Sequence, residues 1–238
     1  PEARAFYLFD RPRSLVAESY RSLRAVLLAH PGRDDCRAIV VTSSLPGEGK
    51  THCCVGLGVA FAQLGLTTVI VDADLRRPRQ AGLFGKEQSP GLRELLEGDL
   101  PLAQVVQATH VPRLGVLAAG SPADNPTELL ASPAMHALLR QLRDAYQVVL
   151  LDTAPAGLTS DAAALTAEAD GILMIVRRDH APRKVAEEAL EQLRRVGSTV
   201  LGVALNDMPV SRAKAAYGEG YYTDKQRPGA PRGGPSSA

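Results

Sequence analysis

The chain has 238 residues, a formal net charge of +1, 45% hydrophobic residues and 22% charged residues. This length supports one substantial core, and the composition is ordinary for a globular domain. The near-zero net charge gives no global reason to expect a nucleic-acid partner. No apolar run reaches the roughly 18 residues of a membrane-spanning helix, and no signal peptide is recognised. The chain begins without Met, which leaves open a membrane segment upstream.

Helix and strand patterns alternate along most of the chain. Residues 1–13 show no clear periodicity and are interpreted as an N-terminal extension. One domain is predicted over 14–210, followed by a disordered tail at 211–238 that is rich in Ala, Gly, Pro and Ser. Apolar residues recurring at about 100° per residue indicate helices, and short apolar, β-branched runs indicate strands. Helices are predicted at 14–29, 51–64, 91–96, 127–146, 160–168 and 182–196, and strands at 38–42, 67–71, 114–118, 148–151, 171–176 and 200–205.

The predicted strands are continuous apolar runs rather than alternating ones. Such runs are typical of a parallel sheet that is covered by helices on both faces, so the predicted fold class is α/β with a mostly parallel central sheet. The three cysteines, Cys36, Cys53 and Cys54, match no metal-ligand spacing. They are expected to be buried apolar residues.

A glycine-rich loop follows the first predicted strand and precedes a helix, with the sequence Ser-Leu-Pro-Gly-Glu-Gly-Lys-Thr over 44–51. Its backbone amides can close around phosphates, Lys50 can reach the outer phosphates, and Thr51 offers a hydroxyl to Mg²⁺. A P-loop NTPase-type fold that binds ATP and Mg²⁺ is therefore predicted, although the pattern normally begins with Gly where this chain has Ser44. The residues predicted to contact the nucleotide are Pro46, Gly47, Glu48, Gly49, Lys50, Thr51, His52 and Asn206.

Carboxylates stand at the ends of two buried strands. Asp72 and Asp74 follow one strand and Asp152 follows another. The carboxyl ends of parallel strands converge on the ligand-binding mouth of the sheet, where carboxylates can hold Mg²⁺ or polarise a hydroxyl nucleophile. The alternative is that each Asp caps a following helix, but three together with Lys50-Thr51 favour a functional site.

Some polar residues leave two interpretations open. Asn206 is either a hydrogen-bonding partner of the adenine edge or a turn residue, and His52 is either a helix-start filler or a functional residue. The basic segments at 76–79 (Arg-Arg-Pro-Arg) and 177–178 (Arg-Arg) either contact phosphate or an acidic partner, or form a solvated surface.

From about residue 14 to 206, the sequence resembles the bacterial tyrosine kinases of exopolysaccharide and capsule synthesis. The resemblance rests on TSSLPGEGKT, VIVDADLRRP, VVLLDTAP and the segment NPTELL at 125–130. It implies that Lys50 and Thr51 bind MgATP, that Asp74 and Asp152 handle Mg²⁺, and that Asp72 acts as the base toward a tyrosine hydroxyl. Lys50, Asp72, Asp74 and Asp152 are thus the predicted catalytic residues, and Thr51, Asp74 and Asp152 the predicted metal ligands.

The family also carries a Glu-x-x-Arg-x-x-Arg motif, which here is Glu18, Arg21 and Arg24. At 100° per residue these charges span about 120° of the helix, opposite its apolar side. They form either a solvated face with an intrahelical ion pair or, as the resemblance implies, a contact that builds a ring of identical subunits.

The resemblance further implies a phosphorylated tail. Half of the six tyrosines, Tyr217, Tyr221 and Tyr222, fall in the predicted tail and are the expected phosphoacceptors of a neighbouring subunit. The expected partners are a membrane-embedded polysaccharide co-polymerase or activator domain, fused or separate, and a cognate phosphotyrosine phosphatase. The expected location is the cytoplasm, at the inner face of the cell membrane.

Two other functions remain open from the sequence. A partition or division-site ATPase would share the fold, but its loop carries an extra Lys where this chain has Leu45, and it lacks a tyrosine tail. A non-catalytic module that binds ATP and assembles as a switch would use the same residues without transferring phosphate.

Overall fold

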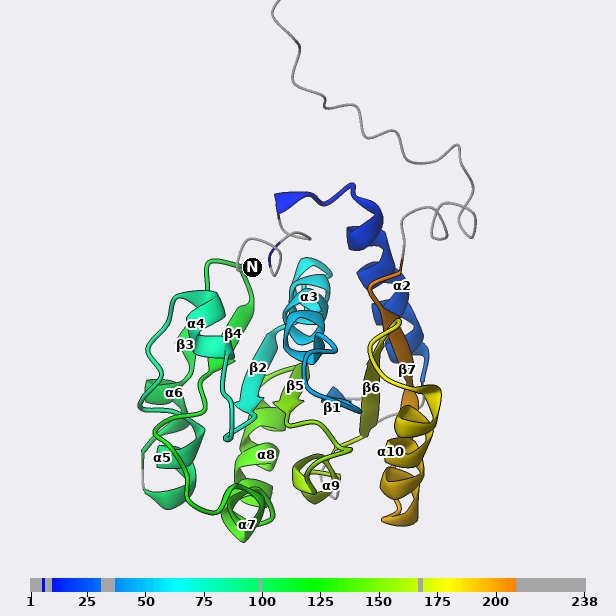
Figure 1. The fold of residues 1–238 in the computed structure, drawn as a ribbon. Coiled ribbons are helices and arrows are strands. Elements are labelled where there is room, and N and C mark those ends of the chain that lie inside the picture. The colour runs from blue at the N-terminus through cyan, green and yellow to red at the C-terminus, as the bar shows by residue number, and fades with distance from the viewer. Residues whose placement is uncertain (1–5, 7–9, 31–36, 99, 167–168, 209–238) are drawn as a thin grey trace, which may run out of the picture.

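The computed structural model describes residues 6, 10–30, 37–98, 100–166 and 169–208 (Figure 1). Within them a seven-stranded sheet has the order β3-β4-β2-β5-β1-β6-β7. Neighbouring strands are parallel except β3 and β4, which are antiparallel. The predicted α/β class with a mostly parallel sheet is confirmed. The strands are β1 Arg37–Ser43, β2 Thr68–Ala73, β3 Gln107–Ala108, β4 Leu114–Leu117, β5 Val148–Thr153, β6 Gly171–Arg177 and β7 Val200–Asn206.

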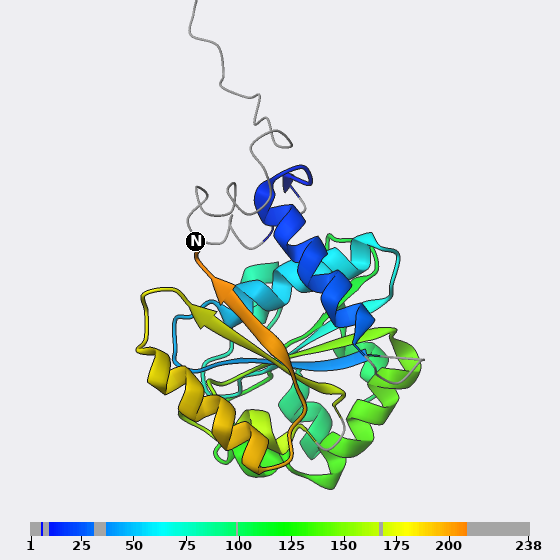
Figure 2. The ribbon, with the colours of Figure 1, turned by 90° about the vertical axis from the view of Figure 1, so that its right-hand side faces the viewer.

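Helices cover both faces of the sheet, as the edge-on view in Figure 2 shows. Helices α2, α3 and α4 contribute to the core on one face, and α5 to α10 to the core on the other. None of the helices in the described ranges is long and apolar enough to cross a membrane. The helices are α2 Leu15–Ala29, α3 Lys50–Gln63, α4 Gln80–Phe84, α5 Leu92–Glu97, α6 Leu102–Val105, α7 Pro126–Leu130, α8 Pro133–Ala145, α9 Asp161–Ala164 and α10 Arg183–Arg195.

The strands supply both cores because successive side chains of a strand point to opposite faces. In β1, Ile39 and Val41 belong to the core that contains Phe61 of α3, whereas Val40 belongs to the core that contains Leu142 of α8. The middle of each central strand is therefore a continuous apolar run that faces both cores. Polar residues follow at the carboxyl ends of these strands. The P-loop follows directly after the central strand β1 at this end of the sheet.

Three of the differences from the sequence-based expectations have a clear physical reason. The single helix expected at 127–146 is two helices, because Ser132 caps α8 by accepting a 3.2 Å hydrogen bond from the amide of Met135 and Pro133 occupies the first helical position. The helix expected at 160–168 covers only Asp161–Ala164. Strand β3, a two-residue antiparallel edge, was not predicted, because two residues are too few to show a period.

Helix α2 packs on α3 through an aromatic ring. Tyr20 lies over Gly56, where a Cβ atom would stand 2.3 Å from the ring. Arg24 donates from Nη1 to the carbonyl of Ala60 at 2.6 Å, so the expectation that the charged residues lie opposite the packed side is wrong for Arg24. The packing of the Tyr20 ring therefore requires glycine at position 56 of α3. The cationic side chain of Arg24 completes the contact between the two helices.

Two of the cysteines follow the sequence-based expectation. Cys53 and Cys54 are buried in α3, and burial raises the pKa of both thiols, that of Cys53 to about 11. Cys36 lies outside the described residues. A buried thiol with a raised pKa carries little thiolate, so these residues are packing residues.

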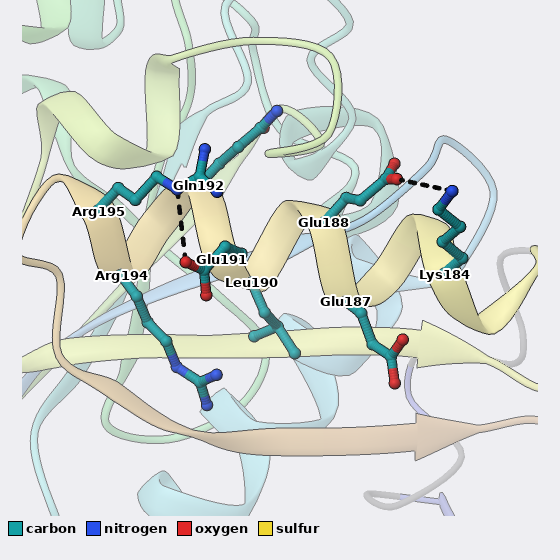
Figure 3. A pocket seen from close by; sticks show the side chains of 8 residues that line it. All are labelled: Lys184, Glu187, Glu188, Leu190, Glu191, Gln192, Arg194 and Arg195. Atoms are coloured by element: carbon teal, nitrogen blue, oxygen red, sulfur yellow. Dashed lines mark hydrogen bonds and ion pairs between the residues drawn. The ribbon is translucent and has the colours of Figure 1, made fainter.

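A hollow of about 540 Å³ runs along the outside of α10 (Figure 3). Its lining side chains all come from this one helix, and ion pairs such as Lys184–Glu188 and Glu191–Arg195 bridge successive turns. Arg183 and Glu187, four residues apart on the same helix, form a further exposed pair. The hollow is a solvated charged surface, and none of its lining residues belongs to the P-loop.

Candidate functional site

Two glycines in left-handed conformations shape the loop between β1 and α3. Gly47 has φ 82° and Gly49 has φ 91°, values that residues with side chains rarely adopt. Helix α3 begins at Lys50, so the loop leads into a helix N-terminus, which favours an anion. Among the described residues, the amides of Gly47, Glu48 and Gly49 have no internal acceptor. These amides are available to phosphate oxygens.

Ser44 accounts for the departure from the usual first glycine. Its hydroxyl donates to Oε2 of Glu48 at 2.7 Å, and the amide of Leu45 donates to the same oxygen at 2.7 Å. The other oxygen of this buried carboxylate accepts from the amide of Arg177 at 3.2 Å. Ser44 thus ties the start of the loop to its middle through a hydrogen bond that glycine cannot form.

Side chains from the end of β7 and from the turn after β6 form hydrogen bonds with the backbone of the loop between β1 and α3. Asn206 donates from Nδ2 to the carbonyl of Glu48 at 2.9 Å, and its Oδ1 accepts from the amide of Asp207 at 2.8 Å. A Cβ atom on Gly49 would lie 2.3 Å from this Nδ2. His180 lies 2.8 Å from the carbonyl of Pro46 through its Nε2. The Nδ2 of Asn206 therefore holds the loop, while its Oδ1 is held by the neighbouring backbone, as is expected of a positioning residue.

The Lys50 ammonium group lies between two strand-end carboxylates. Its Nζ is 2.7 Å from Oδ2 of Asp74 and 3.5 Å from Oδ1 of Asp152, and it is 3.3 Å from the hydroxyl of Thr51. Burial lowers the pKa of Lys50, but the charges of Asp152 and Asp74 outweigh it, and the net pKa is raised. The side chain is therefore held as a cation at the N-terminus of α3, directly after the glycine-rich loop.

Asp72 and Asp152 face each other in register across β2 and β5. Both are fully buried. Burial, and then the neighbouring charge of Asp152, raise the pKa of Asp72 to about 8, and burial raises the pKa of Asp152. One oxygen of Asp72 accepts from the amides of Arg79 and Gln80 at 2.9 and 2.8 Å, whereas Oδ1 has no partner. A raised pKa makes the ionised carboxylate a stronger base, and its unpartnered Oδ1 can accept a proton once the group has ionised.

Gln80 is a site residue that the sequence-based reasoning missed. It is fully buried at the start of α4 and donates from Nε2 to Oδ2 of Asp152 at 2.9 Å. Its Oε1 has no hydrogen-bond partner in the described part of the chain. No residue pattern marks it, because its position depends on the turn by which the chain returns from Asp74 to the sheet.

The arginines of the segment 76–79 have different roles. Arg76 forms a forked pair with Asp161, through Nε to Oδ2 at 2.9 Å and Nη2 to Oδ1 at 3.2 Å, and also donates to the hydroxyl of Thr127 at 3.0 Å. Asp161 is fully buried and was expected only as part of a helix start. The backbone after Asp74 is thereby tied to α7 and α9. Arg77 and Arg79 are exposed.

The remaining predicted site residues within the described ranges lie on α2 and α3. His52 is half-buried in the first turn of α3, and its ring makes no hydrogen bond within the described ranges. On α2, Arg21 pairs with Glu18 at 3.2 Å and donates to the carbonyl of Pro12 at 2.6 Å. The ring contact therefore stays a prediction. Tyr217, Tyr221 and Tyr222 lie outside the described residues.

The donor set suits a nucleotide and its metal ion. The free amides at 47–49, the helix N-terminus and Lys50 fit phosphate, and the oxygens of Thr51, Asp74 and Asp152 are of the kind that Mg²⁺ prefers. In the described part of the chain, no group of three or more His, Cys, Asp or Glu side chains is arranged to hold a metal alone. A magnesium ion here would complete its coordination with phosphate and water oxygens.

Comparison with known proteins finds both a matching family and individual relatives. Residues 36–201 match the family described as AAA domain. Tyrosine-protein kinase YwqD of Bacillus subtilis is 34% identical over 90% of this chain and 89% of its own length. EpsB of Ralstonia nicotianae is 35% identical over 92% of this chain, which spans only 29% of that longer protein.

Solved structures agree with these matches. The chimerical protein CapA2B2 is 31% identical, with a TM-score of 0.82 over 86% of this chain and 90% of that one. The kinase domain of the Escherichia coli tyrosine kinase ETK is 30% identical, with a TM-score of 0.80 over 85% and 80% of the two chains. The septum site-determining protein MinD of Pyrococcus horikoshii, complexed with Mg-ADP, is 23% identical with a TM-score of 0.61 over 76% of each chain, a likeness of fold alone. The fold is that of a nucleotide-binding P-loop NTPase, and the chain belongs to the family of bacterial tyrosine-protein kinases.

Proposed function

We propose that the chain is an ATP-dependent autokinase that phosphorylates Tyr217, Tyr221 and Tyr222 of a neighbouring copy. The observation that carries this proposal is the buried cluster at the strand ends, in which Asp72 keeps one unpartnered oxygen beside the carboxylates that hold Lys50. A kinase site needs a cation for the phosphates and, close by, a group that receives the proton of the acceptor.

The proposed reaction assigns a role to each group. The tyrosine oxygen attacks the γ-phosphorus of ATP, the bond from this phosphorus to the β,γ-bridging oxygen breaks, and ADP leaves with that electron pair. The phenolic proton passes to Asp72. Lys50 and the loop amides at 47–49 bind and orient the phosphates, while Thr51, Asp74 and Asp152 are the proposed Mg²⁺ ligands. The metal ion, when bound, neutralises charge on the phosphates.

The proposed assembly is a ring of identical subunits that contact one another through Glu18, Arg21 and Arg24. The proposed partners are a membrane-embedded polysaccharide co-polymerase or activator domain, fused or separate, and a cognate phosphotyrosine phosphatase. The chain would act at the cytoplasmic face of the membrane to regulate polymerisation and export of exopolysaccharide or capsule. The similarity to EpsB, YwqD and CapA2B2 supports this setting.

The test is the chemical state of the tail after incubation with MgATP. Mass spectrometry should find phosphate on at least one of the three tail tyrosines, and Lys50→Met should abolish it because the phosphates lose their cation. The matched control is Lys184→Met, an exposed lysine on α10 that should leave phosphorylation unchanged.

The same experiment separates the kinase from the two other functions. ATP turnover to free phosphate with an unmodified tail would contradict the kinase and favour a division-site type of ATPase. ATP-dependent assembly with neither turnover nor phosphotyrosine would favour the non-catalytic switch. A chain with all three tail tyrosines replaced by Phe identifies phosphorylation elsewhere.

A further inference from the structure

The segment that follows Asp74 forms part of the wall of the site. The amide of Arg77 donates to Oδ1 of Asp74 at 3.0 Å, and the amide of Arg79 donates to Oδ2 of Asp72 at 2.9 Å. Two arginines therefore start from backbone that touches the proposed catalytic carboxylates.

Among the described residues, only one of the three guanidinium groups in the segment 76–79 is held by other parts of the chain. Arg76 is engaged by Asp161 and Thr127, and its role is to tie the segment down. Arg77 and Arg79 are exposed, and their guanidinium groups have no hydrogen bond or ion pair within the part of the chain that the structure describes. Two long cationic side chains at the edge of an active site are thus free for an anionic ligand.

The proposed acceptor tyrosines carry the complementary charge in their sequence. The charged residue nearest to Tyr217 and to Tyr221 is Glu219, two positions from each, and the one nearest to Tyr222 is Asp224, also two positions away. The lysines and arginines of residues 209–238 all lie outside the stretch 217–224. Each acceptor is therefore presented beside a carboxylate.

We infer that Arg77 and Arg79 determine acceptor specificity by binding the carboxylates of Glu219 and Asp224 when a tail tyrosine enters the site. The inference rests on the proposed function, because it concerns how the same site selects its substrate. Guanidinium groups bind carboxylates in forked geometry, and free side chains can follow whichever tyrosine is presented. Exposed ion pairs are weak individually, so the expected selectivity of two pairs is about 3- to 10-fold in kcat/KM.

The test measures phosphorylation of peptides by the full chain in which Tyr217, Tyr221 and Tyr222 are replaced by Phe. One peptide has the sequence of residues 213–226, and the other carries Glu219→Gln and Asp224→Asn. With MgATP, the acidic peptide should show a 3- to 10-fold higher kcat/KM at low salt. Adding Arg77→Gln and Arg79→Gln to the kinase should remove this preference while leaving kcat/KM for the neutral peptide within about twofold.

Charge reversal distinguishes recognition from damage to the site. A kinase with Arg77→Glu and Arg79→Glu should prefer a peptide with Glu219→Lys and Asp224→Lys over the acidic one. The matched control is Arg194→Gln with Arg195→Gln, which removes the same charge from exposed positions at the far end of α10 and should retain the preference. Nucleotide binding and thermal unfolding of each variant confirm an intact site.

The outcomes separate this inference from the proposed function. Equal rates on the acidic and neutral peptides, or a preference that survives loss of both arginines, would overturn the inference and leave the kinase intact. Phosphorylation of neither peptide, together with an unmodified tail in the unaltered chain, would contradict the proposed function itself.

Discussion

Asp72 shows how a single buried side chain can be prepared for proton transfer. The carboxyl group is fully buried and lies in register with Asp152, and these two causes together raise its pKa to about 8. Two backbone amides hold one oxygen and leave the other unpartnered. The geometry fixes the orientation of the group without using the oxygen that would receive a proton.

Replacement of Asp72 by Asn is expected to change how stability depends on pH. Between the ordinary value of 3.8 and about 8, the folded chain keeps a proton that the unfolded chain has lost. The free energy of unfolding therefore falls as pH rises, by at most about 1.4 kcal/mol per pH unit from this group. Asn cannot ionise, so Asp72→Asn should gain stability relative to the unaltered chain between pH 5 and pH 8.5.

Urea unfolding of both proteins at the two pH values, without nucleotide, measures this difference. Asp144→Asn on α8, whose side chain is exposed, is the control and should show no such gain. A stability difference between Asp72→Asn and the unaltered chain that is the same at both pH values would contradict the raised pKa.

Single residues also mark where sequence-based reasoning stops. The carboxylates of Asp72, Asp74 and Asp152 were predictable because the carboxyl ends of parallel strands lie on the same side of the sheet. Gln80 was not, because its place beside Asp152 depends on a turn that no local pattern specifies. Ser44 was noted as a departure, but its bond to Glu48 required the folded loop.

At the scale of elements, Arg76 joins three parts of the chain that are distant in sequence. Its guanidinium group links the backbone after β2 to Asp161 in α9 and to Thr127 in α7. A buried carboxylate left without its partner is costly, so this pair stabilises the approach of the three elements. Asp74 lies two residues before Arg76, at the start of the attached segment.

Arg76→Ala is expected to destabilise the fold by about 1–3 kcal/mol, because it leaves the buried Asp161 without its charged partner. The loss is not larger because Arg76 itself is partly exposed and its ion pair is screened by solvent. The control is Arg183→Ala, which removes an exposed ion pair with Glu187 and should change stability by less than about 0.5 kcal/mol. Chemical unfolding of both variants compares them directly. Equal effects of the two substitutions would show that the attachment adds nothing beyond a surface pair.

Helices and strands with a long repeating pattern of apolar residues were predictable. Helix boundaries that depend on a capping residue were not. Strands such as β1 and β5 contain unbroken apolar runs, and they lie within two residues of their predicted bounds. The helix expected at 127–146 is interrupted because Ser132 and Pro133 begin a new helix, a local signal that the long apolar period concealed. In α2, Arg24 lies against α3 because the stem of the side chain packs while its charge finds a backbone carbonyl.

At the scale of the whole molecule, the predicted family and fold are confirmed. Both could be predicted because a P-loop after an inner strand of a parallel sheet requires particular residue types in the strand, the loop and the following helix. The ring and the phosphorylated tail stay predictions.

Nucleotide binding should stabilise the entire domain through linkage. At 100 times the dissociation constant, a ligand that binds only the folded state adds about 2.7 kcal/mol, which for a chain of this size raises Tm by roughly 5–10 °C. Differential scanning calorimetry with MgADP should show this shift, and Lys50→Met should lose most of it. The control is AMP at the same concentration. A Lys50→Met chain that keeps the full shift would contradict the assignment of the phosphate site.

The contact of Lys50 with Asp74 and Asp152 has a further consequence. Without ligand, this lysine is the counter-ion of the carboxylates, so a polyphosphate that draws it away removes their neutralisation. A divalent cation that arrives with the polyphosphate restores it. Nucleotide and metal should therefore bind with positive cooperativity, each raising the affinity for the other by the same factor. Metal-free nucleotide would bind weakly, because the exchange of counter-ions would be incomplete.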